Sequence, residues 1–418
     1  MRFLILTQYY PPEIGGAATR LQATAEQLVR CGHEVEVVTA RPNYPLGKFF
    51  DGRGLSPYVR EERNGIPVHR VIVYPAVGGG LGRMLNYLSF AIMSIAGLLR
   101  AKRPDYLFVE SPPLLMCIPA FLAKRIFGIP YIFNISDLWP DAIAEAGLIP
   151  NRLLLRTLLG MESFSYRHAA YVSVVTDSIR ESLISQKHVP ADKILFLPNG
   201  ANLARDRPRE ADPRFKASLN LGGKKIILWA GTIGYAHGLE FVLQAAKLLE
   251  QRPEIHFLFL GDGSARSDLE TLAAAMDLTN VSFKDPVPND ELAPYYGIAD
   301  CGLASLRILE ANRGARPSKI FPVWASGRAV IFIGEGECAR VVEASRAGIV
   351  VPPENPALLA REIFRLLEQP GLTAQLGENG RRFVEENYDW SNIIANWLRN
   401  LHQAPRGAFT PSSISATR

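Results

Sequence analysis

The chain has 418 residues, of which 48% are hydrophobic and 21% charged, and a formal net charge of +5. This composition is typical of a globular protein, and the length favours two domains over one. Lysine and arginine are dispersed, without a long basic tract, which argues against nucleic-acid binding. The four cysteines form no CxxC pair and no Asp-x-Asp occurs, so the sequence predicts no disulfide framework, no metal site and a reducing, cytoplasmic location.

Strand-like and helix-like segments alternate through the first half. The N-terminal run ends in Tyr-Tyr-Pro-Pro-Glu without a small-residue cleavage site, so we expect a buried first strand and not a signal peptide. The strand candidates are RFLILTQYY, EVEVVTA, PVHRVIVY, YLFVES, YIFNIS, AYVSVVT and KILFLPN, with helices expected over 16–31, 113–127 and 151–168. Several strands are apolar throughout, which predicts a parallel sheet covered on both faces.

One segment, MLNYLSFAIMSIAGLL at 84–99, is apolar nearly all round. It is short for a membrane span, which needs about 20 residues. Two interpretations stay open. The segment is either a helix buried on the sheet, or a helix that packs on one side and touches an anionic membrane surface on the other. The membrane interpretation would be assisted by the basic residues Arg83, Arg100, Lys102 and Arg103. It places the protein peripherally on the inner face of the cytoplasmic membrane.

The second half repeats the alternating pattern after a polar run rich in charge, proline and glycine, LARDRPREADPRFKASLNLGG. Its strand candidates are KKIILWAG, IHFLFLGDG, VSFK, DCGLAS, AVIFIG and GIVVPP. We therefore predict two doubly wound α/β domains, over 1–202 and 203–387, whose strand C-termini face a shared cleft. A closing helix is expected over 388–403, packed back on the first domain, and 404–418 is expected to be disordered.

Glycine-rich loops follow strand candidates in both halves. Gly15 and Gly16 follow the first strand and precede a helix, whose free N–H groups suit an anion. In the second half, three successive loops hold Gly231, Thr232, His237, Gly261, Asp262, Gly263, Arg266, Arg316, Ser318 and Lys319. The helix dipole disfavours a cation at a helix start, and a bound anion would explain why Arg316 and Lys319 occur there. The loops together predict a phosphorylated ligand, while the absence of a GxGxxG strand–helix junction disfavours NAD.

A pair of carboxylates follows the strand YIFNIS, in the stretch SDLWPDAIAEAG. Asp137 and Asp141 flank Trp139 at the expected cleft end of the sheet. Carboxylates there could accept a hydroxyl proton or hold sugar hydroxyls. The alternative, that Asp137 only caps the following helix, has equal weight.

The motifs YYPPEIGGAATRL, DLWPDAIAEAG, LPNGAN, GTIGYAHGLE and RGARPSK resemble the family 4 glycosyltransferases of the GT-B fold. The likeness spans 1–402 and is greatest to bacterial enzymes resembling N-acetyl-L-fucosamine transferases of surface-polysaccharide biosynthesis. It implies retaining transfer of a hexosyl or N-acetylhexosaminyl group from a nucleotide donor, expected to be UDP-linked, to a lipid-linked or glycan acceptor of O-antigen or capsule. It also implies no cofactor and no essential metal.

The resemblance assigns roles to individual positions. Asp137, Arg316 and Lys319 would be catalytic, and Arg316 and Lys319 would meet the donor diphosphate. Donor contacts are implied for Gly15, Gly16, Gly231, Thr232, His237, Gly261, Asp262, Gly263, Arg266, Ser318 and Glu343, with 284–287 near the nucleobase. Acceptor contacts are implied for Trp139, Asp141 and Asn199.

The sequence also departs from the family pattern. The family's paired glutamates, spaced E-x7-E, would fall on Gly314 and Pro322, so the carboxylate that usually holds the ribose hydroxyls is missing. A histidine common in the loop after the fifth strand falls near Ser136. Two alternatives therefore stay open: a sugar-nucleotide epimerase on the same fold, and a non-catalytic homologue that binds a nucleotide-sugar.

Overall fold

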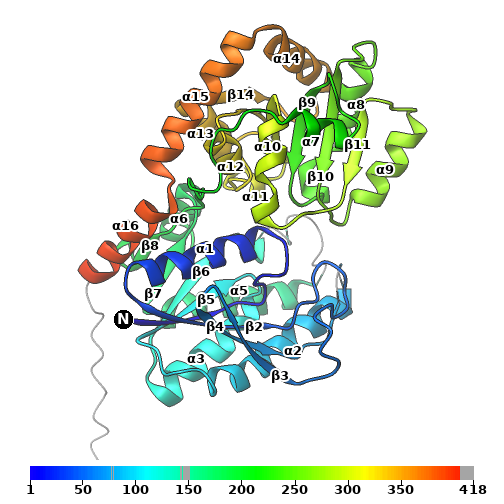
Figure 1. The fold of residues 1–418 in the computed structure, drawn as a ribbon. Coiled ribbons are helices and arrows are strands. Elements are labelled where there is room, and N and C mark those ends of the chain that lie inside the picture. The colour runs from blue at the N-terminus through cyan, green and yellow to red at the C-terminus, as the bar shows by residue number, and fades with distance from the viewer. Residues whose placement is uncertain (77, 79, 142–143, 145–150, 405–418) are drawn as a thin grey trace, which may run out of the picture.

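The computed structural model describes residues 1–404 apart from 77, 79, 142–143 and 145–150. The expected disordered tail therefore lies outside the described residues from 405 onward. Two separate sheets organise the chain, one above the other in Figure 1. This is the two-domain, doubly wound α/β architecture that the alternating sequence pattern predicts.

The first sheet has the strand order β3-β4-β2-β1-β5-β6-β7-β8. Its strands are β1 (Arg2–Leu6), β2 (Glu34–Ala40), β3 (Tyr58–Arg63), β4 (Ile66–Val71), β5 (Tyr106–Ser111), β6 (Tyr131–Ile135), β7 (Tyr171–Val174) and β8 (Ile194–Phe196). All neighbours are parallel except β3 and β4. The sequence pattern did not predict β3, because YVREER has too few apolar residues to indicate a strand. The strand lies at the edge of the sheet, where charged side chains are tolerated.

Helices cover both faces of this sheet. Among its described residues, this domain has the helices α1 (Gly16–Arg30), α2 (Gly80–Leu98), α3 (Cys117–Phe127), α5 (Arg152–His168) and α6 (Asp177–Ser185). Leu21 and Leu28 of α1 pack with Phe3 and Phe108 on one face. Phe90 of α2 and the buried residues of α3 pack on the other face. The helices predicted over 16–31, 113–127 and 151–168 are thus present with small shifts at their ends.

The apolar helix α2 is buried on one side only. Gly97 lets it approach the sheet closely, because a Cβ at that position would lie 2.6 Å from Val38 Cγ1. By length and mean hydropathy (1.3) α2 could cross a membrane, but it packs along β2 and β4. Its outward side is an apolar stripe, with Leu81 76% and Ile92 58% exposed. The stripe comprises Leu81, Met84, Leu85, Leu88, Ile92 and Leu99, the last just beyond the helix end.

The second sheet is fully parallel, in the order β11-β10-β9-β12-β13-β14. Its strands are β9 (Lys225–Ala230), β10 (Ile255–Leu260), β11 (Val281–Lys284), β12 (Cys301–Ser305), β13 (Ala329–Ile333) and β14 (Gly348–Val351). The helices that surround it are α7 (Pro213–Ser218), α8 (Glu240–Leu248), α9 (Arg266–Ala275), α10 (Ala293–Ile298), α11 (Glu310–Arg313), α12 (Ile320–Ala325), α13 (Glu337–Ser345), α14 (Pro356–Glu368) and α15 (Pro370–Asn387). The strand order reverses beside β1 in the first sheet and beside β9 in the second, and such points are where doubly wound folds bind ligands.

The last helix, α16 (Trp390–Gln403), returns the chain to the first domain. Trp397 is fully buried and lies 5.9 Å, ring to ring, from both Phe3 and Phe108. Figure 1 shows α16 beside α1 and β8, away from the second sheet. Because α15 leads directly into α16, this packing fixes one side of the connection between the domains.

Candidate active site

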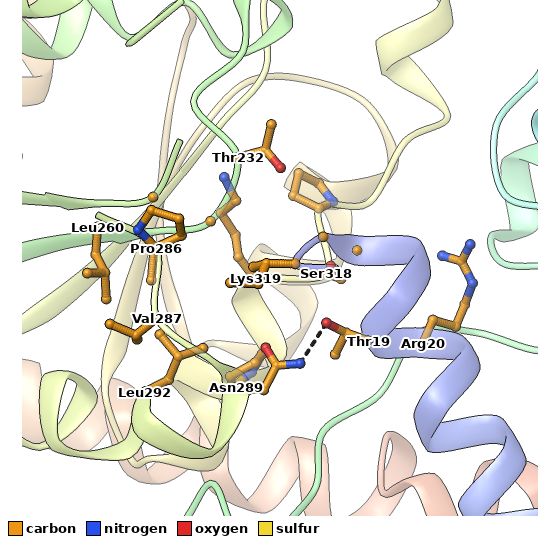
Figure 2. Close-up of a pocket in the computed structure, with 18 of the residues that line it drawn as sticks. Thr19, Arg20, Thr232, Leu260, Pro286, Val287, Asn289, Leu292, Ser318 and Lys319 are labelled. Carbon is orange, nitrogen blue, oxygen red and sulfur yellow. Dashed lines mark hydrogen bonds between the residues drawn. The ribbon is translucent and has the colours of Figure 1, made fainter. Parts of the chain in front are cut away.

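The cleft between the domains has a volume of about 260 Å³. Loops after β1, β2, β9 and β10 and the start of α12 line it, so both strand-order reversal points contribute. Figure 2 shows α1 forming one wall and residues of the second domain forming the other. Of the predicted site residues, the structure brings together Gly15, Gly16, Asn199, Gly231, Thr232, His237, Gly261, Asp262, Ser318 and Lys319.

The glycine loops bring backbone close to the cleft. Helix α1 begins at Gly16 and runs for 15 residues, so its unpaired N–H groups open toward the cleft. Gly231 has φ of 133°, a conformation that other residues rarely adopt. At Gly261, a Cβ would collide with the carbonyl oxygen of Gly231, so the two loops can touch only without side chains. The site is therefore shaped for backbone contact with a ligand.

Lys319 provides an amine on the second-domain wall. Its Nζ is buried without a hydrogen-bond partner, although other parts of the residue remain partly exposed. It lies 3.1 Å from the centre of the Trp229 ring. Desolvation lowers the pKa of Lys319 well below its usual range. Figure 2 shows the side chain extending from beside Ser318 toward Thr232, at the meeting point of the loops.

His237 also contacts Trp229, with 5.0 Å between the centres of the imidazole and indole rings, so the indole lies against both His237 and Lys319. The Nδ1 atom lies 2.8 Å from the carbonyl oxygen of Ser305, and a carbonyl only accepts, so Nδ1 carries the hydrogen. Desolvation and, secondarily, Lys319 lower the pKa of His237 to about 3. The imidazole is therefore neutral at physiological pH, and its Nε2 is an acceptor.

A buried polar row lies behind the first-domain wall of the cleft, and of its members Arg20 and Asn199 line the cleft itself. Arg20 of α1 pairs with Glu110 and donates to Asn199 Oδ1 at 3.3 Å. Asn134 donates to the other oxygen of Glu110 at 2.7 Å, and the strand register places Ser173 next to Asn134. Three buried polar atoms of this row have no partner: Arg20 Nε, Asn134 Oδ1 and Ser173 Oγ. Ordered water would satisfy them, and a polar ligand group in the cleft could satisfy Arg20, which is the one of the three residues on the lining.

Asp137 follows this row at the end of β6 but does not line the cleft. Desolvation by neighbouring protein atoms raises the pKa of Asp137, as does Glu110, while Arg20 lowers it. The residue nevertheless keeps much of its own surface in solvent, so water screens part of that rise. The alternative expectation was that Asp137 caps the following helix. That segment lies only partly within the described residues, so this role stays a prediction.

Several predicted residues lie elsewhere. Arg316 is buried behind the cleft, where Nη1 donates to the Tyr388 hydroxyl at 2.8 Å and Nη2 to the Val175 carbonyl at 3.0 Å. Arg266 pairs with Glu270 and Asp285 on the surface of α9. The remaining predicted residues outside the lining are Gly263, which packs on the Ile233 backbone, Glu343, exposed on α13, Trp139, packed on the first-domain core, and Asp141, ion-paired with Lys187.

Arg316 and Asp141 are absent from the cleft for the same reason. Each charge already has protein partners, and those partners hold it away from the space that a ligand would fill. The spacing of Arg316 and Lys319 along the chain cannot reveal this, because a short turn sends the two side chains to opposite sides of the helix start. Arg83, within α2, likewise has a protein partner: its guanidinium lies 4.8 Å from the centre of the Tyr87 ring and donates to the Tyr87 hydroxyl at 2.9 Å.

The structure also adds cleft residues that the sequence did not single out. They include Ile14, Thr19, Arg20, Tyr44, Pro45, Arg205, Asn289, Leu292, Tyr296 and Trp390. Pro286 and Val287 also line the cleft, and they belong to the 284–287 stretch for which the resemblance implies a place near the nucleobase. Pro322 lines the cleft as well, at the position where a glutamate is missing. One signal was available: Glu110 is a carboxylate inside an apolar strand, and buried carboxylates need partners. Among the described residues, no group of three or more His, Cys, Asp or Glu side chains is placed to hold a metal ion.

Comparison with known proteins decides the family. Residues 15–200 match the Glycosyl transferase 4-like domain, and residues 224–369 match Glycosyl transferases group 1. The chain belongs to the family 4 glycosyltransferases. The glycosyltransferase is 28% identical to a putative colanic acid biosynthesis glycosyl transferase, WcaI, of Escherichia coli (strain K12), over 96% of this chain and 100% of that protein.

Solved structures agree on the fold. Sucrose-phosphate synthase from Thermosynechococcus elongatus superposes with a TM-score of 0.75 at 19% identity, covering 96% of this chain and 98% of that one. HepE of Anabaena, in complex with UDP-glucose, superposes with a TM-score of 0.73 at 16% identity, covering 96% of this chain and 100% of that one. These likenesses, with the two parallel sheets, establish the GT-B fold that the motifs implied.

Proposed function

We propose that this glycosyltransferase moves a sugar, with retention of configuration, from a UDP-linked donor to a lipid-linked or glycan acceptor in bacterial surface-polysaccharide assembly. The donor class is supported by HepE, whose structure holds UDP-glucose in the same fold. The pathway is supported by the colanic acid relative, which the chain covers completely. The resemblance supports retention, a hexosyl or N-acetylhexosaminyl sugar and a reaction that needs no metal.

One observation carries the donor site: the unpartnered Lys319 Nζ at the junction of the glycine loops. A buried amine without a partner costs stability unless a ligand completes it. The start of α1 opens on the same cleft from the other domain, so backbone N–H groups and the Lys319 amine converge there. A diphosphate is the ligand that matches this set of donors.

The same geometry suits the chemistry of transfer. As the bond between sugar and diphosphate breaks, negative charge grows on the phosphate oxygens. Lys319 and the α1 N–H groups would stabilise that charge, and one fixed donor of this kind is typically worth about 3 kcal/mol. His237 offers a neutral acceptor nitrogen for a donor-side hydroxyl, while Arg20 and Asn199 present polar groups from the acceptor side. Closure of the two domains would exclude water and favour transfer over hydrolysis.

A lipid-linked acceptor would require the protein to work at a membrane surface. The apolar stripe of α2 supports this arrangement, since Leu81, Leu85, Leu88 and Ile92 face solvent along one side of the helix. Lys102 and Arg103 are exposed just after it and would meet anionic lipid headgroups. We place the enzyme in the cytoplasm, peripherally bound to the inner face of the cytoplasmic membrane.

The experiment is a donor screen by nucleotide release, with UDP-, GDP- and ADP-sugars and a polyprenyl-diphosphate glycan as acceptor, with and without EDTA. We expect acceptor-dependent release of UDP that EDTA leaves unchanged. Lys319→Met should lower kcat/KM about 100-fold, whereas Lys247→Met, on the exposed side of α8, should have no effect. Conversion of a UDP-sugar without acceptor would favour an epimerase, and no turnover or thermal shift with any nucleotide would overturn the proposal.

A further inference from the structure

The environment of Lys319 combines burial with the lack of a counter-ion. Its Nζ has no hydrogen-bond partner and lies over the Trp229 ring at 3.1 Å. Gly231 forms the adjacent wall, where a Cβ would lie 3.7 Å from Nζ. The first residues after Lys319 are apolar, since α12 has the sequence IFPVWA. Among the described residues, therefore, protein packs around the amine without offering it an acceptor.

The charged and titratable groups around it are engaged elsewhere. His237 is neutral, with its Nδ1 hydrogen given to Ser305. Asp262 is a carboxylate on the lining, and its Oδ1 accepts from the backbone N–H of Gly263 at 2.8 Å. Across the cleft, Arg20 pairs with Glu110 and Arg205 with Asp206. No ion pair joins Lys319 to any carboxylate in the described part of the chain.

These surroundings disfavour an ammonium ion in the free protein. Removing an ammonium from water costs several kcal/mol, and a π-face returns about 2 kcal/mol at a desolvated site. Desolvation accordingly lowers the pKa of Lys319 well below its usual range. The buried, unpartnered Nζ therefore favours the neutral amine, which has two N–H donors and one lone pair, over the ammonium ion in the free protein.

We propose that binding of the donor's diphosphate to this cleft is coupled to the uptake of one proton from solvent by Lys319 Nζ. The inference deepens the proposed function and rests on it. The neutral amine gains a proton and becomes an ammonium with three donors, and the diphosphate oxygens supply the missing counter-charge. When the nucleoside diphosphate leaves after transfer, the proton returns to solvent.

The sign of the pH dependence follows from this coupling. Bound diphosphate raises the pKa of Lys319, so protonation and binding favour one another. Affinity is highest at low pH and falls by up to tenfold per pH unit as the pH rises above the free-state pKa. The fall ends where the pH exceeds the bound-state pKa. A lysine charged in both states would give no such dependence.

The test is titration calorimetry of the full-length protein with UDP at about pH 8, where the terminal phosphate, with a pKa of about 6, is already ionised. Titrations in HEPES and in Tris, which differ in ionisation enthalpy, give the number of protons exchanged. We expect the uptake of nearly one proton by the wild type. Lys319→Arg, which keeps a cation at every accessible pH, should bind UDP with uptake near zero and with a Kd that hardly changes between about pH 7 and 9.

Each outcome is informative. UDP binding by the wild type without proton uptake overturns the coupling and leaves the donor site intact. Uptake that persists in Lys319→Arg assigns the proton to another group and overturns the role of Lys319. The wild-type titrations need no variant, so the result stands even if Lys319→Arg folds poorly. A wild type that binds none of UDP, GDP and ADP removes the proposed donor site and the coupling with it.

Discussion

Asn289 of the second domain donates a hydrogen bond to Thr19 of the first, with 2.9 Å between Nδ2 and Oγ1 (Figure 2). Thr19 belongs to the first turn of α1, and Asn289 follows Pro286 and Val287 at the other edge of the cleft. A second contact between the domains joins α6 and α13, where Ser178 N–H donates to Glu337 Oε2 at 2.7 Å. The two domains are therefore joined by a hydrogen bond between lining residues of the cleft and by another outside its lining.

Thr19→Val tests whether the bond between Asn289 and Thr19 stabilises the arrangement of the two domains around the cleft. Valine keeps the shape of the side chain and removes the acceptor. We therefore expect the domain contact to lose about 1 kcal/mol of stabilisation, which corresponds to about a fivefold rise in the donor KM. The free energy of unfolding should change by less than about 0.5 kcal/mol, since only a contact between domains is lost. Thr19→Ser, which keeps the hydroxyl, should restore the wild-type KM; equal KM values for all three proteins would contradict the role of this bond.

Arg316→Met separates a structural role from a diphosphate-binding one. Arg316 donates to Tyr388 and Val175, and Nη1 lies 3.7 Å from Glu337, which is also buried. Removing one member of a buried ion pair typically costs about 3 kcal/mol, so we expect a marked fall in unfolding free energy measured by urea denaturation. Donor Kd should stay within about twofold of wild type, because the guanidinium does not reach the cleft.

Tyr388→Phe is the matched control for that change. It removes one hydrogen bond and leaves the Arg316 charge paired, so about 1 kcal/mol of stability should be lost. If Arg316→Met kept full stability and lost nucleotide binding, the assignment from family resemblance would be right and the structural one wrong.

Arg316 and Lys319 show which features the sequence is sufficient to predict and which it is not. The strands, the two-domain plan and the glycine loops follow from local patterns of apolar residues and turn residues, and the structure has them nearly where expected. Arg316 and Lys319 are three residues apart, yet one faces Tyr388 and the other Trp229. Direction at that scale is set by tertiary packing, which a pattern along the chain does not encode.

The buried polar row behind the first-domain wall of the cleft shows a second limit of prediction from sequence. Arg20, Glu110 and Asn134 come from α1, β5 and β6, and only the order of the strands brings them together. Each looks ordinary in its own segment. The cleft lining at Thr19 and Asn289 is similar, because its members lie 270 positions apart and meet only across the domain interface.

Glu13 predicts a pH-dependent stability that is separate from catalysis. Its carboxylate accepts backbone N–H groups of Asn43 at 3.0 Å and of Tyr44 at 2.9 Å, and so holds the loop that brings Tyr44 to the cleft. Desolvation raises the pKa of Glu13 to about 7, although these bonds and Arg70 oppose the rise. The folded state therefore holds a proton that the unfolded state releases near pH 4.5.

Stability should consequently fall as the pH rises through this window. With the folded pKa above the unfolded one, the Glu13 contribution is complete below about pH 4.5 and declines by about 3 kcal/mol up to about pH 7. Glu13→Gln cannot ionise, so the difference in urea unfolding free energy between it and the wild type should shift by that amount in favour of the variant. A difference that does not change with pH would show that Glu13 titrates normally.

Ile92→Glu tests the membrane contact through α2. Ile92 is 58% exposed in the middle of the apolar stripe, so a carboxylate there should leave the fold intact and oppose both insertion and anionic headgroups. We expect wild-type protein to co-sediment with phosphatidylglycerol vesicles and the variant to lose at least about tenfold in affinity, equivalent to 1.4 kcal/mol. Leu248→Glu is the matched control, because Leu248 is also 58% exposed but lies on the second domain. Equal sedimentation of Ile92→Glu and Leu248→Glu would exclude this helix as the contact, and equal thermal unfolding of both would show that any difference arises at the membrane.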